Sequence, residues 1–241
     1  MEMCFEIEFF PGSIDLRACL TSGQVFRWKE IQPNTWAGVD GGHWYVVRET
    51  PKSFHVNSNG NESDFRRLFR LDQDWVRAER DLLSRGPELT ELLRRWKGLR
   101  VLRQSDPAET LFCFLCTANN HIPRITSMIA KLAAYGESFV ERPEMRKFPT
   151  SEEIAEIGEA KLRDLGFGYR AKSITKAAHF LLDQPEDWLK SLRDRSYAEA
   201  HESLLQVPGV GPKLADCIAL FGLDIQTSVP KIGRASCRER V

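Results

Sequence analysis

The sequence predicts an α+β fold in which an antiparallel β-sheet is followed by a long series of helices. Residues 5–61 alternate apolar and polar side chains between Pro, Asn and Gly turns, which is typical of short strands. After Asp64 the apolar residues recur at three- and four-residue spacing, which is typical of amphipathic helices. The chain has 241 residues and is 42% hydrophobic, enough to build two compact units.

The predicted strands lie in five segments: FEIEFF at 5–10, VFRWKEI at 25–31, TWAGV at 35–39, HWYVVRE at 43–49 and SFHVN at 53–57. The sequence Asp40-Gly41-Gly42 separates the third segment from the fourth and is a typical hairpin turn. The polar turn TSGQ at 21–24 precedes the second segment and has no evident packing role. We therefore expect a sheet of sequential hairpins.

Helical periodicity begins at residues 64–85 and continues at 88–104. The second of these segments carries a basic cluster, made of Arg94, Arg95, Lys97, Arg100 and Arg103. A solvated helix face is the usual meaning of such a cluster, and a stripe facing phosphates is the alternative. We place the domain boundary after this segment, with an α+β domain at 1–104 and an all-helical domain at 105–230.

The balance of charges and the spacing of the cysteines limit the functions that the chain can have. Lys plus Arg and Asp plus Glu both total 34, so any affinity for nucleic acid must come from local patches and backbone amides. The six cysteines lack the spacing of a disulfide scaffold or a zinc site. Cys113 and Cys116 form a C-x-x-C inside an apolar helical run, which favours buried thiols over redox chemistry. No segment has the length of a membrane span or the features of a signal peptide, so we expect no membrane association.

Two polar turns interrupt the helical part. Asp106 and the proline after it begin an apolar helix that ends in ANNH at 118–121, where the amides of Asn119 and its neighbour either cap the helix or bind an exposed base. Arg124 follows within one turn. In FGYR at 167–170, Tyr169 and Arg170 are either an aromatic–arginine pair that enters a nucleic-acid stack or a packed tyrosine with a surface arginine.

The stretch LLQVPGVGPKLADCIALFG at 204–222 is the most informative. An apolar helix stops at Pro208, turns through Gly209-Val210-Gly211 and restarts at Pro212, which suits a first helical position. Glycines let backbone N–H groups approach a ligand, and a helix N-terminus carries partial positive charge. The turn is therefore predicted to hold an anion such as a phosphate.

Lys213 lies in the first turn of the second helix of this hairpin. The helix dipole disfavours a cation there and so favours the neutral amine, the form that attacks carbon and forms a Schiff base. An ordinary solvated lysine is the alternative that this turn alone leaves open.

Together these motifs resemble eukaryotic 8-oxoguanine DNA glycosylases of the helix-hairpin-helix base-excision superfamily. The resemblance covers residues 16–230 and rests on SGQVFRW at 22–28, ANNHIPRIT at 118–126, LGFGYRAK at 165–172 and VPGVGPKLADC at 207–217, in the family's order. It implies that a damaged base is rotated out of the duplex and that Lys213 displaces it, forming a Schiff base that undergoes β-elimination. We therefore expect a bifunctional glycosylase and lyase acting on 8-oxoguanine opposite cytosine.

The resemblance also implies roles for individual residues in contact with the lesion. The carbonyl of Gly23 would accept a hydrogen bond from N7–H of 8-oxoguanine, a proton that guanine lacks, and Cys217 would form a wall of the base pocket. Asn119 would fill the gap left by the flipped base, with Tyr169 as a wedge beside it.

Further implied contacts involve the opposite strand and the backbone. The opposite cytosine would be read by Arg124 and Arg170, and phosphate would be held at Gly209, Val210 and Gly211. Main-chain carbonyls of Leu205, Val207 and Val210 are implied to hold a structural cation, with no side-chain metal site and no required cofactor. By the same resemblance we expect a monomer that binds double-stranded DNA, hands its product to downstream base-excision repair enzymes, and is found in the nucleus and also in mitochondria.

The last residues depart from the family pattern. The family has a Val-Pro-Val-Asp segment whose aspartate is essential, whereas Val229-Pro230 is followed here by Lys231-Ile232. Residues 232–241, IGRASCRERV, match one reading frame of a common sequencing adapter, so we expect 231–241 to be a non-native tail on a truncated copy. The chain as written is expected to show little or no turnover. This leaves open the alternative of a non-catalytic helix-hairpin-helix module that binds lesions.

Overall fold

The structure, a computed structural model, describes residues 2–230, so the predicted tail lies outside the described residues. The chain divides into two compact units. The first consists of Met1–Arg103 together with Phe139–Met145, and the second consists of Gln104–Ser138 together with Arg146–Val241. We describe each unit by itself.

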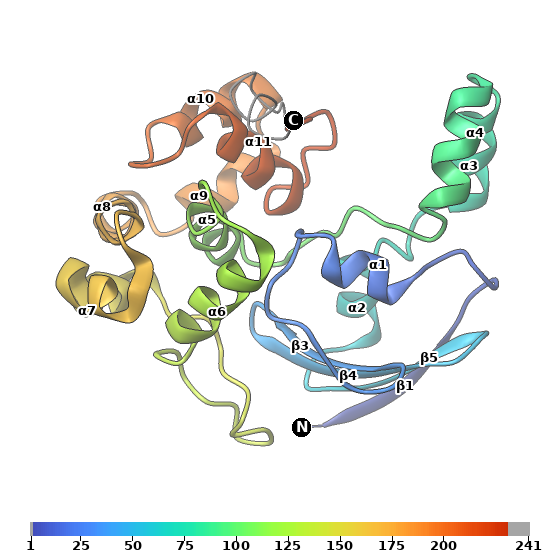
Figure 1. The fold of residues 1–241 in the computed structure, drawn as a ribbon, viewed down its shortest axis with the longest axis horizontal. Helices are drawn as coiled ribbons and strands as arrows, with labels where there is room; N and C mark the ends of the chain where they lie inside the picture. The colour runs from blue at the N-terminus through green and yellow to red at the C-terminus, as the bar shows by residue number, and fades with distance from the viewer. Residues whose placement is uncertain (1, 231–241) are drawn as a thin grey trace. The chain divides into compact units, whose positions relative to one another are not determined.

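The first unit contains a five-stranded antiparallel sheet in the order β1-β5-β4-β3-β2 (Figure 1). The strands are β1 Met3–Glu8, β2 Lys29–Gln32, β3 Thr35–Asp40, β4 His43–Glu49 and β5 Ser53–Ser58. Asp40 pairs with His43 across the β3–β4 turn, and Gly41 there has a φ of 54°, which confirms the predicted hairpin.

The second predicted strand is wrong over its first half. Val25 and Trp28 precede β2 and are buried outside the strands. The Trp28 ring stacks on Tyr45, with 5.8 Å between ring centroids, and lies over Gly38, where a Cβ atom would fall 2.1 Å from the indole. Packing of this indole on the sheet therefore takes precedence over the β-propensity of the segment.

Two helices cover one face of the sheet (Figure 1). They are α1 Leu16–Thr21, which the strand pattern did not predict, and α2 Glu62–Leu68. Asp15 caps α1 by accepting a hydrogen bond of 2.8 Å from the amide of Ala18. Leu16 and Phe65 pack with Tyr45 and other strand residues in one buried cluster.

The opposite face of the sheet is covered by a segment from much later in the chain. Phe139 packs with Val39 and Trp44, and Arg142 lies 5.0 Å from the centroid of the Trp44 ring. The predicted boundary places residues 139–145 in the helical domain, and the structure corrects this because their apolar contacts are with the sheet.

The predicted helix at 64–85 is two helices, because Arg70 adopts a φ of 51° and Asp74 caps a new start. The new helix is α3 Trp75–Leu83, and it packs against α4 Pro87–Arg95. The helix predicted at 88–104 ends with α4, and residues 96–104 form no helix.

The basic cluster of this region is divided between two environments. Arg94 and Arg95, in the last turn of α4, are exposed, as a solvated helix face predicts, whereas Arg100 and Arg103 are not exposed. Arg100 is 3% exposed, and its Nε donates a hydrogen bond of 3.1 Å to the carbonyl of Ser13. Its guanidinium lies 4.1 Å from the centroid of the Trp75 ring. Arg103 pairs with Asp72 at 3.0 Å. These two arginines therefore hold the first unit together.

The second unit is helical, as predicted. Its helices are α5 Pro107–Leu115, α6 Ile122–Ala133, α7 Ser151–Leu162, α8 Arg170–Leu182, α9 Trp188–Ser191, α10 Tyr197–Leu205 and α11 Pro212–Phe221. The buried α5 contacts α8, α9 and α11 and begins at its predicted cap, Asp106. Cys113 and Cys116 lie in this core, as predicted, and burial raises the pKa of Cys116 to about 12. None of the helices found in residues 2–230 combines the length and apolar character that a bilayer crossing requires.

Candidate DNA-binding and catalytic site

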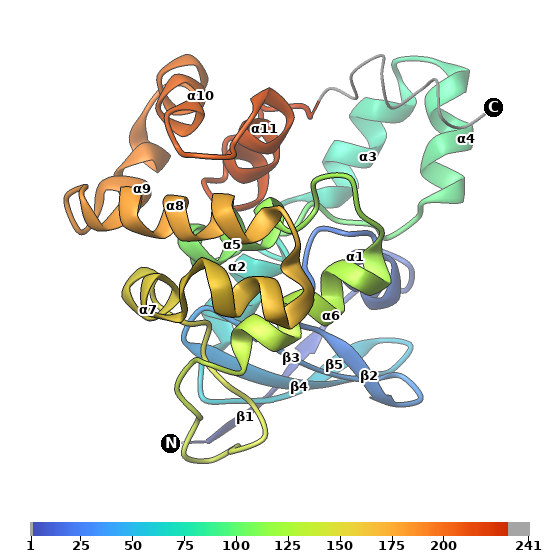
Figure 2. The ribbon, with the colours of Figure 1, turned by 60° about the vertical axis from the view of Figure 1, so that its left-hand side comes forward.

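The helix-hairpin-helix predicted at 204–222 is present, with α10 and α11 side by side (Figure 2). The amide of Val210 donates a hydrogen bond of 3.0 Å to the carbonyl of Val207, which closes the turn. Gly209 has a φ of 88°, and a Cβ atom there would lie 2.6 Å from the Cβ of Ser173. A Cβ atom on Gly211 would meet nothing within 4 Å, so this side of the turn is open. Gly209 is thus needed for the conformation of the turn, whereas Gly211 leaves the turn open to a ligand.

The N-terminus of α11 is free to bind an anion. Its N-cap, Gly211, provides no side-chain hydrogen bond, and its first turn contains no acidic residue. The first amides of a helix then keep their donors and their partial positive charge for a ligand.

The same feature recurs at the other two helices that the sequence assigns to DNA contact. The first turns of α6, which carries Arg124, and of α8, which carries Arg170, also lack both a side-chain cap and an acidic residue. In contrast, α5, α7 and α10 of the same unit are capped by Asp106, Thr150 and Ser196. A chain without net positive charge can therefore still present donors to phosphates at these three starts.

Lys213 and Cys217 lie one turn apart on α11. Lys213 is exposed, whereas Cys217 is 8% exposed. Burial raises the pKa of Cys217 to about 11, although the nearby charge of Lys213 acts in the opposite direction. Cys217 is therefore a neutral thiol near pH 7, which suits a wall of a pocket better than a nucleophile.

A cluster of polar residues around the buried Asp216, on the same helix, was not predicted from the sequence. Asp216 is 5% exposed and accepts a hydrogen bond of 2.7 Å from the hydroxyl of Tyr197. The hydroxyl of Ser228 donates to the backbone carbonyl of Asp216 at 3.0 Å, and Nε2 of His201 lies 3.6 Å from the carboxylate. The available signal was a single carboxylate inside the otherwise apolar run LADCIALF.

The two asparagines in the turn after α5 have different roles. Asn120 donates from its side chain to the carbonyl of Cys116 at 3.0 Å and so caps the helix, which is one of the two predicted alternatives. Asn119 has a φ of 45°, and its exposed side chain has no hydrogen-bond partner among residues 2–230. Asn119 is thus the residue of this turn with an amide available to a ligand.

At the start of α8, only one of the two side chains that were predicted to be exposed is exposed. Tyr169 is 57% exposed, as expected for a wedge, but Arg170 is only 4% exposed. Nε of Arg170 donates to the carbonyl of Ala118 at 3.0 Å, and Nη2 donates to that of Asn119 at 2.8 Å. Neither a packed tyrosine nor a surface arginine is found. Arg124, in the first turn of α6, is exposed.

Gly23 belongs to the first unit, unlike the other predicted site residues. It has a φ of 86° and follows Ser22, whose hydroxyl accepts a hydrogen bond of 2.9 Å from Gln24. Gln24 is buried and also bonds the carbonyl of Arg100 and the amide of Leu102, at 2.9 and 2.8 Å. The polar turn at 21–24 therefore has a structural role, because the side chains on both sides of Gly23 are held by hydrogen bonds.

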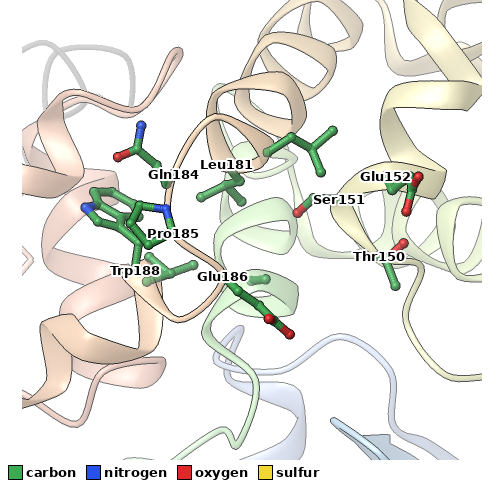
Figure 3. Close-up of a pocket in the computed structure, with 11 residues that line it drawn as sticks. Thr150, Ser151, Glu152, Leu181, Gln184, Pro185, Glu186 and Trp188 are labelled. Carbon is green, nitrogen blue, oxygen red and sulfur yellow. The ribbon is translucent and has the colours of Figure 1, made fainter.

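A cavity of about 510 Å³ lies elsewhere in the second unit (Figure 3). Its walls come mainly from the start of α7 and from the α8–α9 connection, with Pro185 and Trp188 on one side and Thr150 on the other. None of the predicted site residues lines it. Glu152 and Glu186 line the cavity, and their negative charge disfavours phosphate there.

Residues 2–230 contain no group of three or more His, Cys, Asp or Glu side chains that could hold a metal ion. A cation at the hairpin would therefore rely on main-chain carbonyls. The carbonyl of Val207 accepts one hydrogen bond in closing the turn, and a carbonyl has a second lone pair.

Comparison with protein families and known proteins gives consistent matches along the chain. Residues 7–111 match the 8-oxoguanine DNA glycosylase N-terminal domain, and residues 112–231 match the HhH-GPD superfamily of base excision DNA repair proteins. The chain is 35% identical to the N-glycosylase/DNA lyase OGG1 of Arabidopsis thaliana, over 94% of this chain and 65% of that protein. It is 33% identical to the N-glycosylase/DNA lyase of Saccharomyces cerevisiae, over 88% of this chain and 63% of that protein. It thus spans less than two thirds of either relative.

Two solved structures are also similar. A structure of MBOgg1 in complex with a low-affinity DNA ligand has a TM-score of 0.84 and 30% identity, and the match covers 95% of this chain and 80% of that chain. The 8-oxoguanine glycosylase/lyase of Clostridium acetobutylicum, in complex with double-stranded DNA containing cytosine opposite 8-oxoguanine, has a TM-score of 0.84 and 27% identity. That match covers 97% of this chain and 83% of the other.

Proposed function

Because the chain belongs to the 8-oxoguanine DNA glycosylase family of helix-hairpin-helix base-excision proteins, we propose that its site is built to remove 8-oxoguanine from duplex DNA opposite cytosine and then to cleave the strand on the 3′ side. Turnover is expected to be low in the chain as written, because Ile232 stands where the family has its aspartate. The observation that carries the proposal is the position of Lys213. It is an exposed lysine in the first turn of an uncapped helix, one turn before a buried thiol. A helix start attracts phosphate, which would bring the DNA backbone close to this lysine.

The reaction begins with extrusion of the damaged nucleotide, because C1′ of a stacked nucleotide is not accessible to a side chain. The neutral amine of Lys213 attacks C1′, the new N–C1′ bond forms, and the bond from C1′ to N9 of the base breaks. The base leaves with the electron pair and is protonated. Opening of the sugar ring gives a Schiff base between the lysine and C1′.

The Schiff base then acts as an electron sink for strand cleavage. Loss of a proton from C2′ is followed by breakage of the bond between C3′ and its oxygen, which releases the 3′ phosphate ester as the leaving group. Hydrolysis of the Schiff base restores Lys213. The product carries a blocked 3′ end, so further repair enzymes must act on it before resynthesis.

The roles of the individual recognition residues are proposed from the family to which the chain belongs. The carbonyl of Gly23 would accept the N7–H hydrogen bond of 8-oxoguanine, and the neutral thiol of Cys217 would contact the base. Asn119 would occupy the vacated position in the helix, Tyr169 would act as a wedge, and Arg124 would contact the opposite cytosine. Discrimination through one buried hydrogen bond is chemically sufficient, because a site that lacks a partner for its polar group rejects the wrong base.

Main-chain amides around Gly209 and Gly211 would bind a phosphate of the lesion strand. We place a structural cation at the carbonyls of Leu205, Val207 and Val210, where neutral oxygen donors suit a hard cation. When bound, it would add positive charge next to the phosphate. No step of the reaction passes through it.

Borohydride trapping tests the role of Lys213. A duplex with a preformed abasic site opposite cytosine needs only the amine, so reduction is expected to cross-link the chain to DNA, and peptide mapping is expected to locate the adduct at Lys213. Lys213→Gln should abolish trapping, whereas Lys172→Gln, which removes an exposed lysine from the first turn of α8, should not. Trapping that persists in Lys213→Gln would exclude it as the nucleophile. Tight lesion binding without trapping would instead favour the non-catalytic module.

A further inference from the structure

We propose that the cavity drawn in Figure 3 is a docking site for a segment of another protein that carries an arginine next to an apolar side chain. The cavity lies in the second unit, and none of the predicted DNA-contacting or catalytic residues lines it. The proposal therefore goes beyond the proposed function and does not depend on it.

One wall of the cavity is apolar. Leu181, Pro185 and Trp188 contribute to it, together with Leu189, which is 6% exposed. Leu182 also lines the cavity and is 49% exposed, so the apolar surface continues toward solvent. A volume of about 510 Å³ is large enough for more than one side chain. An apolar patch that extends beyond a cavity is typical of a surface that binds protein.

The walls of the cavity are held in place by the second unit itself. The Trp188 ring meets Phe180 edge to face, with 5.6 Å between ring centroids and 72° between the ring planes. The Trp188 amide donates a hydrogen bond of 2.8 Å to the carbonyl of Pro185, in the connection between α8 and α9. On the other side, Thr150 and Glu153 cap the start of α7 reciprocally. A ligand therefore meets a preformed cavity, and little free energy is lost in ordering its walls.

The charged groups of the cavity are acidic. Glu152, in the first turn of α7, and Glu186, in the α8–α9 connection, both line it and are exposed. No lysine or arginine is among the described residues that line it. Neither of these carboxylates has an ion-pair partner among residues 2–230, whereas the adjacent Asp187 pairs with Lys190 at 3.6 Å. The cavity therefore favours a ligand with positive charge.

The helix ends around the cavity add to this preference. Leu181 and Leu182 are the last residues of α8, where a helix carries partial negative charge. Glu152 compensates the partial positive charge at the start of its own helix, so Glu186 is the carboxylate more available to a cation. The start of α8, which carries Arg170, lies at the other end of a 13-residue helix, about 18 Å away. Occupation of the cavity thus leaves that helix start free for DNA.

Arginine matches these groups better than other cations do. Its planar guanidinium stacks on an indole such as Trp188 and also forms paired hydrogen bonds with a carboxylate such as that of Glu186. An apolar residue next to the arginine would cover Leu182, which a small cation would leave exposed. The combination of charge and apolar surface therefore points to a polypeptide.

Selection of phage-displayed randomised peptides on the full chain, without DNA, tests the proposal. The enriched peptides are expected to share an arginine close to a leucine, isoleucine or aromatic residue, and the same selection on Trp188→Ala should not enrich them. Failure to enrich any peptide above the bare support would overturn the proposal. Enrichment of acidic or uncharged sequences would also overturn it.

Fluorescence anisotropy with the most enriched peptide then measures each contribution. Trp188→Ala should weaken binding about tenfold or more, as expected for an aromatic residue at the centre of an interface. Because the Trp188 ring packs on Phe180, the half-exposed Leu182→Ser is a second variant that should keep the fold and weaken binding about threefold.

The role of charge has its own matched pair of variants. Glu186→Gln should weaken peptide binding about threefold, and added salt should reduce this difference. Glu202→Gln removes an exposed carboxylate of α10 that does not line the cavity, and should leave binding unchanged. Equal affinities of the two variants would overturn the proposal, because the chemistry of the ligand is inferred from the charge of the cavity.

Two other occupants can be distinguished from a partner peptide. A dimer in analytical ultracentrifugation that Trp188→Ala dissociates would identify a second copy of the chain as the occupant. Displacement of the peptide by an equal concentration of N-acetylarginine amide would identify a small cation. Either result would overturn the proposal.

The outcome is independent of the reaction on DNA. Trp188→Ala and Glu186→Gln should leave affinity for an abasic duplex and borohydride trapping unchanged. A loss of DNA affinity in both variants would place the cavity in the DNA-binding surface and overturn the proposal. If Lys213 failed to trap, the proposed function would fail, and peptide binding would still decide the role of the cavity.

Discussion

The Tyr197 hydroxyl donates a hydrogen bond of 2.7 Å to Oδ1 of Asp216 and so joins α10 to α11 behind the hairpin. Ser228 adds hydrogen bonds to the backbone and side chain of the same aspartate, at 3.0 and 3.3 Å. Because Ser228 lies two residues before Pro230, this cluster also anchors the last of the described residues. Asp216 lies on α11, the same helix that carries Lys213, and is 5% exposed.

Two substitutions of Asp216 should show whether its hydrogen-bond acceptor or its negative charge stabilises the fold. Asp216→Ala leaves the Tyr197 hydroxyl without its acceptor, whereas the Ser228 hydroxyl keeps the backbone carbonyl of residue 216, and the substitution should lower the free energy of unfolding by about 1–3 kcal/mol. Asp216→Asn keeps an acceptor oxygen and should lower it by about 1 kcal/mol. Urea denaturation measures both, with exposed Asp183→Ala as the control expected within about 0.5 kcal/mol of the parent. Equal losses in the two Asp216 variants would mean that the charge, not the acceptor, matters.

Because of Cys217, the free energy of unfolding of the chain should fall at alkaline pH. Its pKa is raised by burial to about 11, compared with about 9 for a free thiol. Its contribution to stability is therefore fully present below about pH 9 and is lost as pH rises through about 11, since the unfolded chain ionises first. Cys217→Ala should decline less steeply than the parent when the free energy of unfolding is followed across this range. Parallel curves would contradict the assignment.

The two hairpin glycines should respond differently to alanine. Gly209→Ala places a methyl group against Ser173 at a positive φ, and should destabilise the fold by about 1–3 kcal/mol. Gly211→Ala enters open space at an ordinary φ of −99°, so stability should stay within about 0.5 kcal/mol. Its methyl group would nevertheless shield the amides of the α11 start and weaken binding to DNA. Thermal unfolding and duplex anisotropy together test this, and normal DNA affinity in Gly211→Ala would argue against phosphate binding at the turn.

Ile232→Asp should increase base excision. This prediction rests on the family resemblance, because position 232 lies outside the described residues. A carboxylate that stabilises developing positive charge on the sugar should raise the single-turnover rate on 8-oxoguanine opposite cytosine by about 10²-fold or more. Ile232→Asn is the uncharged control and should give no such gain. Ile232→Asp combined with Lys213→Gln should remain inactive, and activity in that double variant would point to another nucleophile.

Features set by neighbouring residues could be predicted from the sequence. The helix starts at Asp106 and Thr150, the β3–β4 turn and the helix-hairpin-helix each depend on a proline, a glycine or a capping side chain within a few positions. The α+β order of the chain follows from the same signals, because periodicity changes once, near residue 61.

Features set by distant partners could not be predicted. Trp28 was predicted in a strand but lies outside the strands, where its ring stacks on Tyr45. Arg100 was predicted in a basic helical segment but is buried, with a hydrogen bond to the carbonyl of Ser13. Arg170 is the clearest case within the candidate site. Its motif predicts a role near DNA, but nothing in the sequence shows that the carbonyl of Ala118 lies within reach of its guanidinium.

The segment Phe139–Met145 has a consequence for synthesis of the chain. The first compact unit includes it, and Phe139 covers the sheet face that carries Val39 and Trp44. During translation this face stays uncovered until residue 145 has left the ribosome, long after the last strand has been made. A gene fragment that stops at residue 104 would therefore encode a sheet with an exposed apolar side, prone to self-association rather than suited to serve as an independent module.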